Sequence, residues 1–165
     1  MGINLIWAEA ANGVIGKDGQ MPWHSHEDMV HFRRLTTGHP IIMGWKTFCS
    51  LGQRPLPNRE NIVLTHHRLD DIKGIKPVSF PQVQQLVSDQ SSDYFVIGGA
   101  SVYQQLLSLA SRLYRTIIQD DYAGDKKMPP IDYDQWQLLD SQTVAASKEG
   151  EPDCIFQVWQ RLDEK

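Results

Sequence analysis

The arrangement of apolar runs along the chain is the feature that most restricts its fold. Short runs rich in isoleucine and valine, such as residues 3–8, 41–43 and 94–97, alternate with stretches of helical spacing. These runs are apolar almost throughout, which is typical of strands covered on both faces. Strands that alternate with helices form α/β folds with a largely parallel sheet. The sequence therefore predicts one α/β domain over residues 1–165, because no segment has the composition of a linker.

Capping residues, glycines and prolines divide the rest of the chain into elements. Residues 26–37 have helical spacing between Ser25, a good helix-capping residue, and Gly38. Residues 136–139 and 155–162 alternate apolar and polar side chains, which predicts an antiparallel pair at a sheet edge. Residues 13–22 carry three glycines and a proline, which is typical of a long mobile loop. The other expected strands are 61–65, 75–78 and 113–121, and the other expected helices are 45–52, 81–88 and 101–110.

Composition and charge argue against several classes of protein. Of 165 residues, 41% are hydrophobic and 22% are charged, as in a packed globule. The formal net charge of −4 argues against a nucleic-acid binder, which needs a basic face to displace counterions. No apolar run approaches the ~20 residues of a membrane span, and the first residues lack the basic start of a secretory signal. The two cysteines have no metal or redox spacing, so we expect a cytoplasmic protein with no membrane partner.

The segment around Asp28 has two interpretations. Ser25 and Asp28 have the spacing of a capping box, in which the two residues only start a helix. Alternatively, Asp28 is a carboxylate in an apolar cleft formed by Met29, Phe32 and Trp23. There it would pair with a cationic or amidine-like ring edge and influence its protonation. The residues by themselves leave both interpretations open.

Three histidines near the same helix raise the possibility of a metal site. His24 and His26 lie on either side of the expected helix start, and His31 points in another direction, so three ligands do not converge. We therefore expect no metal, and histidines that face the solvent.

Two turns between a strand and a helix suit a phosphate group. Residues 43–47 and 96–101 each join a strand to a helix through glycine, where free backbone N–H groups favour anions. Neither turn has the fingerprint of a dinucleotide fold or a P-loop, so each by itself is compatible with an ordinary turn. Two such helix starts in one small α/β domain favour a pyrophosphate held between them, and hence a dinucleotide.

Considered together, the motifs of the chain resemble the dihydrofolate reductase family, in its bacterial chromosomal form. The resemblance covers essentially the whole chain, in order. The matching residues are Ile6-Trp7-Ala8, Val14-Ile15-Gly16-Lys17, Met21-Pro22-Trp23, Asp28 with Phe32, Ile42-Met43-Gly44-x-x-Thr47, Arg54-Pro55-Leu56-Pro57-x-Arg59-x-Asn61, Val96-Ile97-Gly98-Gly99, Tyr103, Thr116 and Gly124-Asp125.

The resemblance implies a fold and an activity. The fold would be an α/β domain with a mixed, mostly parallel eight-stranded sheet flanked by helices. The activity would be reduction of 7,8-dihydrofolate to 5,6,7,8-tetrahydrofolate with NADPH, by hydride transfer to C6 and protonation at N5. The protein would then be a cytoplasmic monomer that supplies one-carbon metabolism and thymidylate and purine synthesis, and an antifolate target.

The resemblance also implies roles for single residues. Asp28 would bond the pterin 2-amino group and N3, aided by Thr116 through a water, and Trp23 would help to order water near the reacting centre. Arg59 would take the glutamate α-carboxylate of the substrate as a bidentate pair. The implied substrate-binding residues are Ile6, Trp7, Ala8, Met29, Phe32, Leu51, Leu56, Arg59, Ile97 and Tyr103.

The implied NADPH site is larger, and the family is noted for a cis peptide between its two glycines, here Gly98 and Gly99. Trp45 stands where the family usually has an arginine that helps to bind the cofactor 2′-phosphate, so a weaker preference for NADPH over NADH is expected. The implied cofactor-binding residues are Ala8, Ile15, Gly16, Met21, Gly44, Trp45, Lys46, Thr47, Leu64, Thr65, His66, Gly98, Gly99, Ala100, Ser101, Val102, Tyr103, Gln105 and Asp125.

Two other functions compete with this one. A pyrimidine or pterin reductase of the same fold would act on another ring, and a substrate without a glutamate tail has no need of Arg59. A non-catalytic nucleotide- or pterin-binding module would bind cofactor without turnover, and would be expected to lack Asp28. Both residues are present, which favours dihydrofolate reduction.

Overall fold

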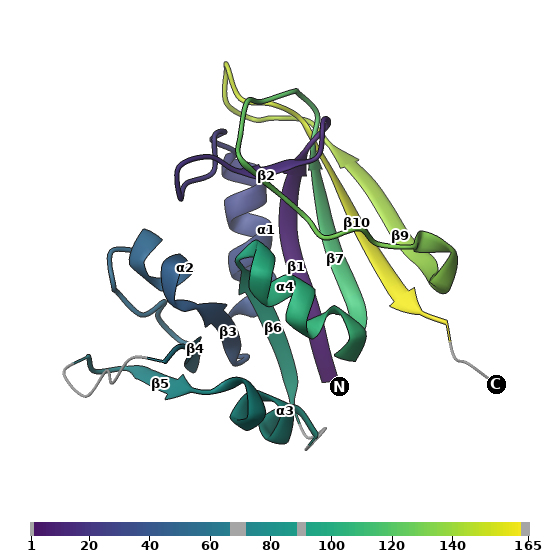
Figure 1. Cartoon of the computed structure of the whole chain (residues 1–165). Helices are drawn as coiled ribbons and strands as arrows, with labels where there is room; N and C mark the ends of the chain where they lie inside the picture. Colours follow the sequence, from purple (N-terminus) through teal and green to yellow (C-terminus); the bar gives the residue numbers. More distant parts are fainter. Residues whose placement is uncertain (1, 67–71, 89–91, 163–165) are drawn as a thin grey trace.

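An eight-stranded sheet forms the centre of the molecule (Figure 1). The computed structural model describes residues 2–66, 72–88 and 92–162. The strand order is β5-β4-β3-β6-β1-β7-β10-β9, and β10 runs antiparallel to both of its neighbours while the other adjacent pairs are parallel. The predicted mixed, mostly parallel sheet of eight strands is thus confirmed. Its strands are β1 (Gly2–Ala10), β3 (Ile41–Gly44), β4 (Asn61–Leu64), β5 (Ile75–Val78), β6 (Asp93–Gly98), β7 (Ala110–Ile118), β9 (Trp136–Val144) and β10 (Cys154–Arg161).

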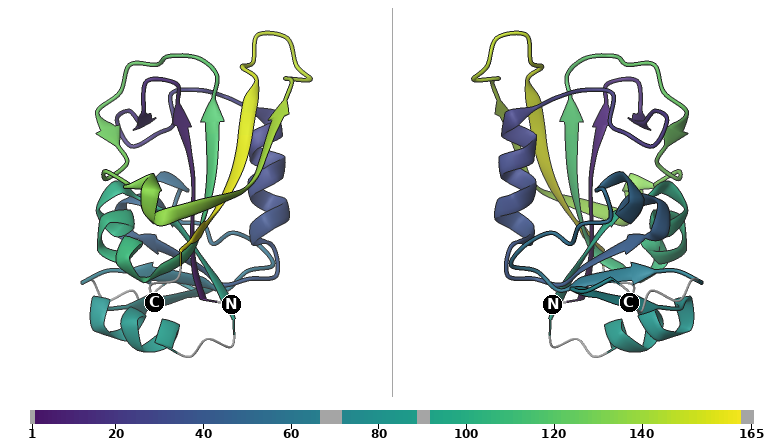
Figure 2. Two further views of the ribbon diagram at one scale, coloured as in Figure 1. Left: turned by 90° about the vertical axis from the view of Figure 1, so that its right-hand side faces the viewer. Right: turned by 90° about the vertical axis from the view of Figure 1, so that its left-hand side faces the viewer.

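Helices cover both faces of the sheet (Figure 2). The central strand β1 shows how the faces are divided, because successive side chains of a strand point in opposite directions. Leu5 and Trp7 belong to the apolar cluster that includes Val83 of α3 and Val102 of α4, whereas Ile6 belongs to the cluster against α1 and α2. The helices are α1 (His26–Thr36), α2 (Trp45–Ser50), α3 (Phe80–Ser88) and α4 (Ala100–Leu106), with short 3₁₀ turns at Leu107–Leu109 and Tyr133–Gln135.

The structure differs from the sequence-based expectations mainly in the glycine-rich segment. Residues 13–22 contain a short strand, β2 (Val14–Gly16), which pairs with β8 (Lys126–Lys127) in a separate two-stranded sheet. The helix expected over residues 101–110 ends at Leu106, and a 3₁₀ turn leads into β7 at Ala110. The expected antiparallel pair at the sheet edge is confirmed as β9 and β10. Within the described ranges, no helix is both long and apolar enough to cross a membrane.

Candidate active site

A cleft of about 940 Å³ lies where several parallel strands end. Its lining includes Gly44 at the end of β3, Leu64 at the end of β4 and Gly98 at the end of β6. The carboxyl ends of parallel strands are the usual place for a ligand in an α/β sheet, because the loops that follow them open a crevice there. One half of the cleft is lined by α1 and the other by the starts of α2 and α4.

Asp28 lies in the first turn of α1 and serves two purposes at once. Its backbone N–H donates to the Ser25 hydroxyl, with a distance of 3.1 Å, so Ser25 is the predicted helix cap. Its carboxyl group lines the cleft and is hydrogen-bonded to Thr116 of β7. The predicted cap by Ser25 is therefore present, but Asp28 does more than start the helix, because it also lines the cleft.

Burial sets the acidity of this carboxyl group. Desolvation raises the pKa of Asp28 from 3.8 to about 6, and the hydrogen bond with Thr116 opposes part of that rise. Thr116 is only 2% exposed and lies beside Ala8 in the sheet register. Such a group is ionised at neutral pH, and it can accept hydrogen bonds from an amidine-like ring edge inside a largely apolar cleft.

The cleft wall near Asp28 is largely apolar, and a hydrogen bond from Tyr103 to the backbone of β1 helps to fix it. Tyr103 is buried, and its hydroxyl donates to the backbone carbonyl of Ile6 over 2.7 Å. This bond ties the start of α4 to the centre of β1, and it satisfies one acceptor site of a carbonyl that borders the cleft. Desolvation keeps the pKa of Tyr103 well above its ordinary value, so its hydroxyl remains a donor.

Arg59 also lines the cleft, and one of its two hydrogen bonds is to Thr36, the last residue of α1. Its Nε donates to the carbonyl of Pro57 at 2.9 Å, and its Nη1 donates to the Thr36 hydroxyl at 3.0 Å. Burial lowers its pKa, and the neighbouring charge of Arg33 adds to that shift, but a guanidinium stays charged in proteins. A guanidinium held in this way in the wall of a cleft is suited to a carboxylate.

In the other half of the cleft, glycines allow the backbone itself to lie against a bound ligand. The Gly98–Gly99 peptide is cis, as the family resemblance implied. A methyl group added at Gly44 would lie 2.9 Å from Val102 Cγ2, so this turn has no space for a side chain. In the described part of the chain, no side chain caps the start of α2 or of α4. The start of a helix without a side-chain cap is suited to an anion, because the first N–H groups have no partner within the helix.

The cleft brings together nearly all of the residues expected from the sequence. Those that line it are Ile6, Trp7, Ala8, Ile15, Gly16, Met21, Asp28, Met29, Phe32, Gly44, Trp45, Lys46, Thr47, Leu51, Leu56, Arg59, Leu64, Thr65, His66, Ile97, Gly98, Gly99, Ala100, Ser101, Val102, Tyr103, Gln105 and Thr116.

Two expected residues, Trp23 and Asp125, are not part of the cleft lining. Trp23 is buried in the apolar cluster around Val14 and Ile118, and its Nε1 has no hydrogen-bond partner among the described residues. Asp125 donates its backbone N–H to Gly16 at 3.0 Å, and its carboxylate accepts from the backbone N–H of Asp18 at 3.4 Å. Asp125 thus contacts the glycine-rich segment instead of the cleft.

Some lining residues were missed by the sequence analysis. His31 lines the cleft, and its ring stacks on Phe156 with 3.8 Å between centroids and 10° between planes. Burial, with the charge of Arg34, lowers its pKa to about 4, so the expectation of a solvent-facing histidine is wrong here. Its spacing of three residues from Asp28 on one helix face was an available signal. The other missed residues are Gly19, Gln20, Arg33, Ser50, Ser79, Phe80 and Lys126.

Comparisons with known proteins agree with this geometry. The model of the dihydrofolate reductase family matches residues 2–161. The chain belongs to the dihydrofolate reductase family. It is 39% identical to dihydrofolate reductase from Bacillus subtilis over 96% of this chain and 94% of that one. It is 40% identical to the enzyme from Haemophilus influenzae over 98% of this chain and 99% of that one.

A solved structure agrees over the same length. Dihydrofolate reductase from Enterococcus faecalis, complexed with NADP(H) and RAB-propyl, has a TM-score of 0.91 with this structure at 29% identity, and the match covers 98% of this chain and 97% of that one. Members of this family reduce 7,8-dihydrofolate with NADPH, and that is the activity of this chain. The starts of α2 and α4, which no described side chain caps, suit the phosphates of such a cofactor. The lack of a side chain at Gly44 also lets the backbone come close to it. Among the described residues there is no cluster of histidine, cysteine and acidic groups that could hold a metal ion.

Proposed function

We propose that Asp28 is the residue of this dihydrofolate reductase that orients the pterin ring and favours its protonation. The observation that carries the proposal is the half-buried Asp28 carboxyl group, hydrogen-bonded to Thr116 in an apolar cleft. As a carboxylate it accepts hydrogen bonds from the 2-amino group and N3 of the substrate. Its negative charge favours a proton at N5, because an opposite charge nearby raises the pKa of a basic nitrogen.

Other residues of the same half hold the rest of the substrate. The side chains of Met29, Phe32, Leu51 and Leu56 cover the pterin and aminobenzoyl rings, and the backbone carbonyls of Ile6 and Ile97 face the pterin edge. Arg59 binds the α-carboxylate of the glutamate tail, and its two bonds to Pro57 and Thr36 reduce the entropy lost on binding. Trp7, Ala8 and Tyr103 complete this half of the site.

The nicotinamide cofactor occupies the other half and, when bound, supplies the hydride for C6 of the substrate. Gly44, Gly98 and Gly99 let the backbone approach the pyrophosphate. Ala8 and Ile15 lie at the nicotinamide, and Thr65 and His66 hold the 2′-phosphate. The other proposed contacts are Gly16, Met21, Trp45, Lys46, Thr47, Leu64, Ala100, Ser101, Val102, Tyr103 and Gln105.

Trp23 and Asp125 act from outside the lining. The buried Nε1 of Trp23 has no hydrogen-bond partner among the described residues, and we assign it to a water that leads toward the reacting centre. Asp125 steadies the glycine-rich segment, from which Gly19, Gln20 and Met21 reach the cleft. Through that segment it helps to exclude water from the two rings.

We further propose that the protein is a single-domain cytoplasmic monomer that does not bind nucleic acid. It supplies tetrahydrofolate for one-carbon metabolism and for thymidylate and purine synthesis, and it is inhibited by antifolates. The net charge of −4 supports the absence of nucleic-acid binding. Light scattering after gel filtration tests the monomer, and a dimer mass would contradict it.

Nicotinamide absorbance tests the assigned site directly. Purified protein with dihydrofolate should oxidise NADPH rapidly, and Asp28→Asn should lose most of that turnover at neutral pH while it keeps its affinity for NADPH. The same assay with NADH measures the cofactor preference in the presence of Trp45. Full turnover in Asp28→Asn would remove Asp28 from the assigned role.

A further inference from the structure

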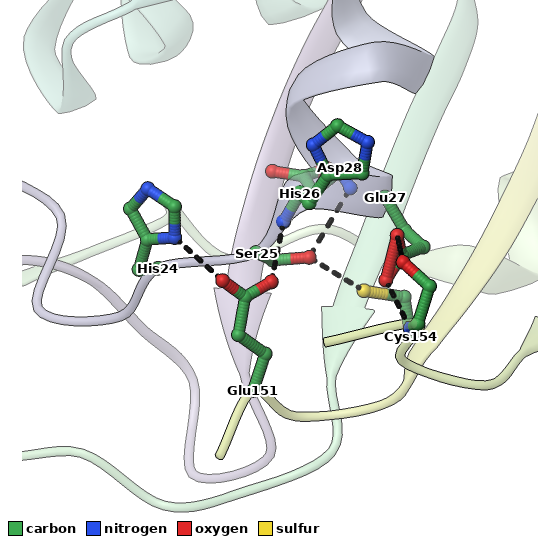
Figure 3. A network of polar contacts seen from close by, with 8 residues as sticks. His24, Ser25, His26, Glu27, Asp28, Glu151 and Cys154 are labelled. Carbon is green, nitrogen blue, oxygen red and sulfur yellow. Dashed lines mark hydrogen bonds and ion pairs between the residues drawn. The ribbon is translucent and has the colours of Figure 1, made fainter. Parts of the chain in front are cut away.

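The loop between β9 and β10 is bonded to the start of α1, far from it in sequence (Figure 3). The Glu151 carboxylate accepts from the backbone N–H of His26, the first residue of α1, at 2.8 Å. Its second oxygen lies 2.8 Å from Nδ1 of His24. The backbone N–H and the hydroxyl of Ser147 donate to Glu27 at 2.7 and 2.9 Å.

The helix cap itself is part of this network. Ser25 Oγ accepts from the backbone N–H of Asp28 and lies 3.3 Å from Sγ of Cys154, the first residue of β10. Ser25 and Cys154 are both buried. Every residue from 24 to 27 is thus bonded to the β9–β10 loop or to the strand that follows it, and these residues lead directly into Asp28 (Figure 3).

The two hydrogen bonds of Glu151, to the His26 backbone and to the His24 ring, differ in how much they contribute. The first N–H groups of a helix have no partner within the helix, and a carboxylate there also interacts favourably with the helix dipole. The Glu151 side chain is 13% exposed, whereas that of His24 is 70% exposed. An exposed ion pair contributes little, so the bond to the His26 backbone is the important one. That bond is also the largest cause of the lowered pKa of Glu151, ahead of His24 and of the charge on Lys148.

We propose that Glu151 is a positioning residue for Asp28. By holding the N–H of His26, it fixes the first turn of α1 so that the Asp28 carboxyl group stays in the cleft, beside Thr116 and away from water. The proposal rests on the proposed role of Asp28. Glu151 is not one of the residues that line the cleft, so we infer that it acts through the backbone of the helix start.

Replacement of Glu151 tests this positioning role. Glu151→Ala should lower kcat/KM for dihydrofolate by about tenfold to a hundredfold, because small misplacements of a reacting group are costly. The apparent pKa in the pH profile of kcat/KM, which reports essential groups of the free enzyme, should also move down toward an ordinary aspartate as water reaches Asp28. The Kd for NADPH should change less than twofold, because the cofactor half of the cleft is lined by the starts of α2 and α4 and not by α1.

Three companion variants separate positioning from general stability. Glu151→Gln keeps an oxygen for the His26 N–H and should recover most of the activity and the original pH profile. His24→Gln removes only the exposed partner and should stay close to the parent enzyme. Glu149→Gln removes a neighbouring exposed carboxylate of the same loop and should change nothing.

Particular outcomes would overturn the inference. If Glu151→Ala is folded by circular dichroism and keeps both the activity and the apparent pKa of the parent, Glu151 does not position Asp28. A lower Tm with an unmoved pH profile would show a merely structural role. If Glu151→Ala does not fold, Glu151→Gln decides: a folded Gln variant that loses most of the parent activity and its pH profile contradicts a role for the retained oxygen. Asp28→Asn, measured in parallel, shows separately whether Asp28 has its proposed role.

Discussion

Replacement of Asp28 by asparagine should make the protein more stable at neutral pH while it removes most of the activity. Burial raises the pKa of Asp28 to about 6 from an ordinary 3.8. Between these two pH values the folded protein therefore holds more protons than the unfolded chain. The free energy of unfolding then decreases as pH rises through this window, and the ionised carboxylate is a full penalty only above about pH 6.

The size of the penalty follows from the pKa difference. Each pKa unit corresponds to about 1.4 kcal/mol, so ionised Asp28 costs about 3 kcal/mol, as an order of magnitude, at pH 8. An asparagine side chain has the same shape and still has a carbonyl to accept from Thr116. Asp28→Asn should thus exceed the parent by up to about 3 kcal/mol at pH 8, with the difference disappearing near pH 4.

Urea denaturation followed by tryptophan fluorescence, at several pH values from 4 to 8, measures this difference. The parent and the variant both contain His31, so its titration cancels in the comparison. Asp121→Asn, at an exposed position, is the matched control and should show no comparable gain. A gain in Asp28→Asn that is equal at pH 4 and pH 8, or no gain at either, would refute the argument that burial penalises the charge.

Three other single substitutions, one of them with a compensating second substitution, probe separate parts of the site. Arg59→Leu should raise KM for dihydrofolate at least tenfold with little change in kcat, since the glutamate tail is remote from the reacting carbon; an unchanged KM in steady-state assays removes Arg59 from the site. The pKa of His31 is lowered to about 4 from 6.5. Between these pH values His31 is protonated in the unfolded chain but not in the folded protein, so the free energy of unfolding decreases as pH falls. His31→Phe keeps the stack on Phe156 and should reduce that acid loss in the same denaturation experiment; an unchanged loss contradicts the assignment. Gly44→Ala should weaken NADPH binding because its new methyl meets Val102, and Val102→Ala in the same chain should restore part of it, as fluorescence titration would show.

The central strands of the fold were predictable because burial on both faces leaves a clear pattern. Strands β1, β3 and β6 are apolar over most of their length, and these were placed within a few residues of their observed bounds. Strands β2 and β8 have three and two residues, which is too short for any periodicity. Their pairing depends on tertiary contact between segments distant in sequence, so no local pattern could have indicated it.

Site residues with a local sequence pattern were predictable, whereas those placed by contacts between distant segments were not. Ser25 and Asp28 carried a recognisable capping pattern, but the hydrogen bond between the Asp28 carboxyl group and Thr116 joins residues that are distant in sequence. Ser79 and Phe80 reach the cleft only because β5 joins the same edge of the sheet. Glu151 showed no local signal, since its partner is a backbone N–H at the start of a distant helix.

The position of β1 between β6 and β7 has a consequence for how the protein is made. Gly2 and the residues after it pair with Asp93 and its neighbours on one side, and with residues of β7 on the other. A ribosome therefore releases the central strand long before either of its partners. Until β6 has emerged, β1 has two unpaired edges, and until β7 has emerged it still has one. Unpaired strand edges favour aggregation of nascent chains. Early contact with a chaperone would protect the strand on which the whole sheet depends.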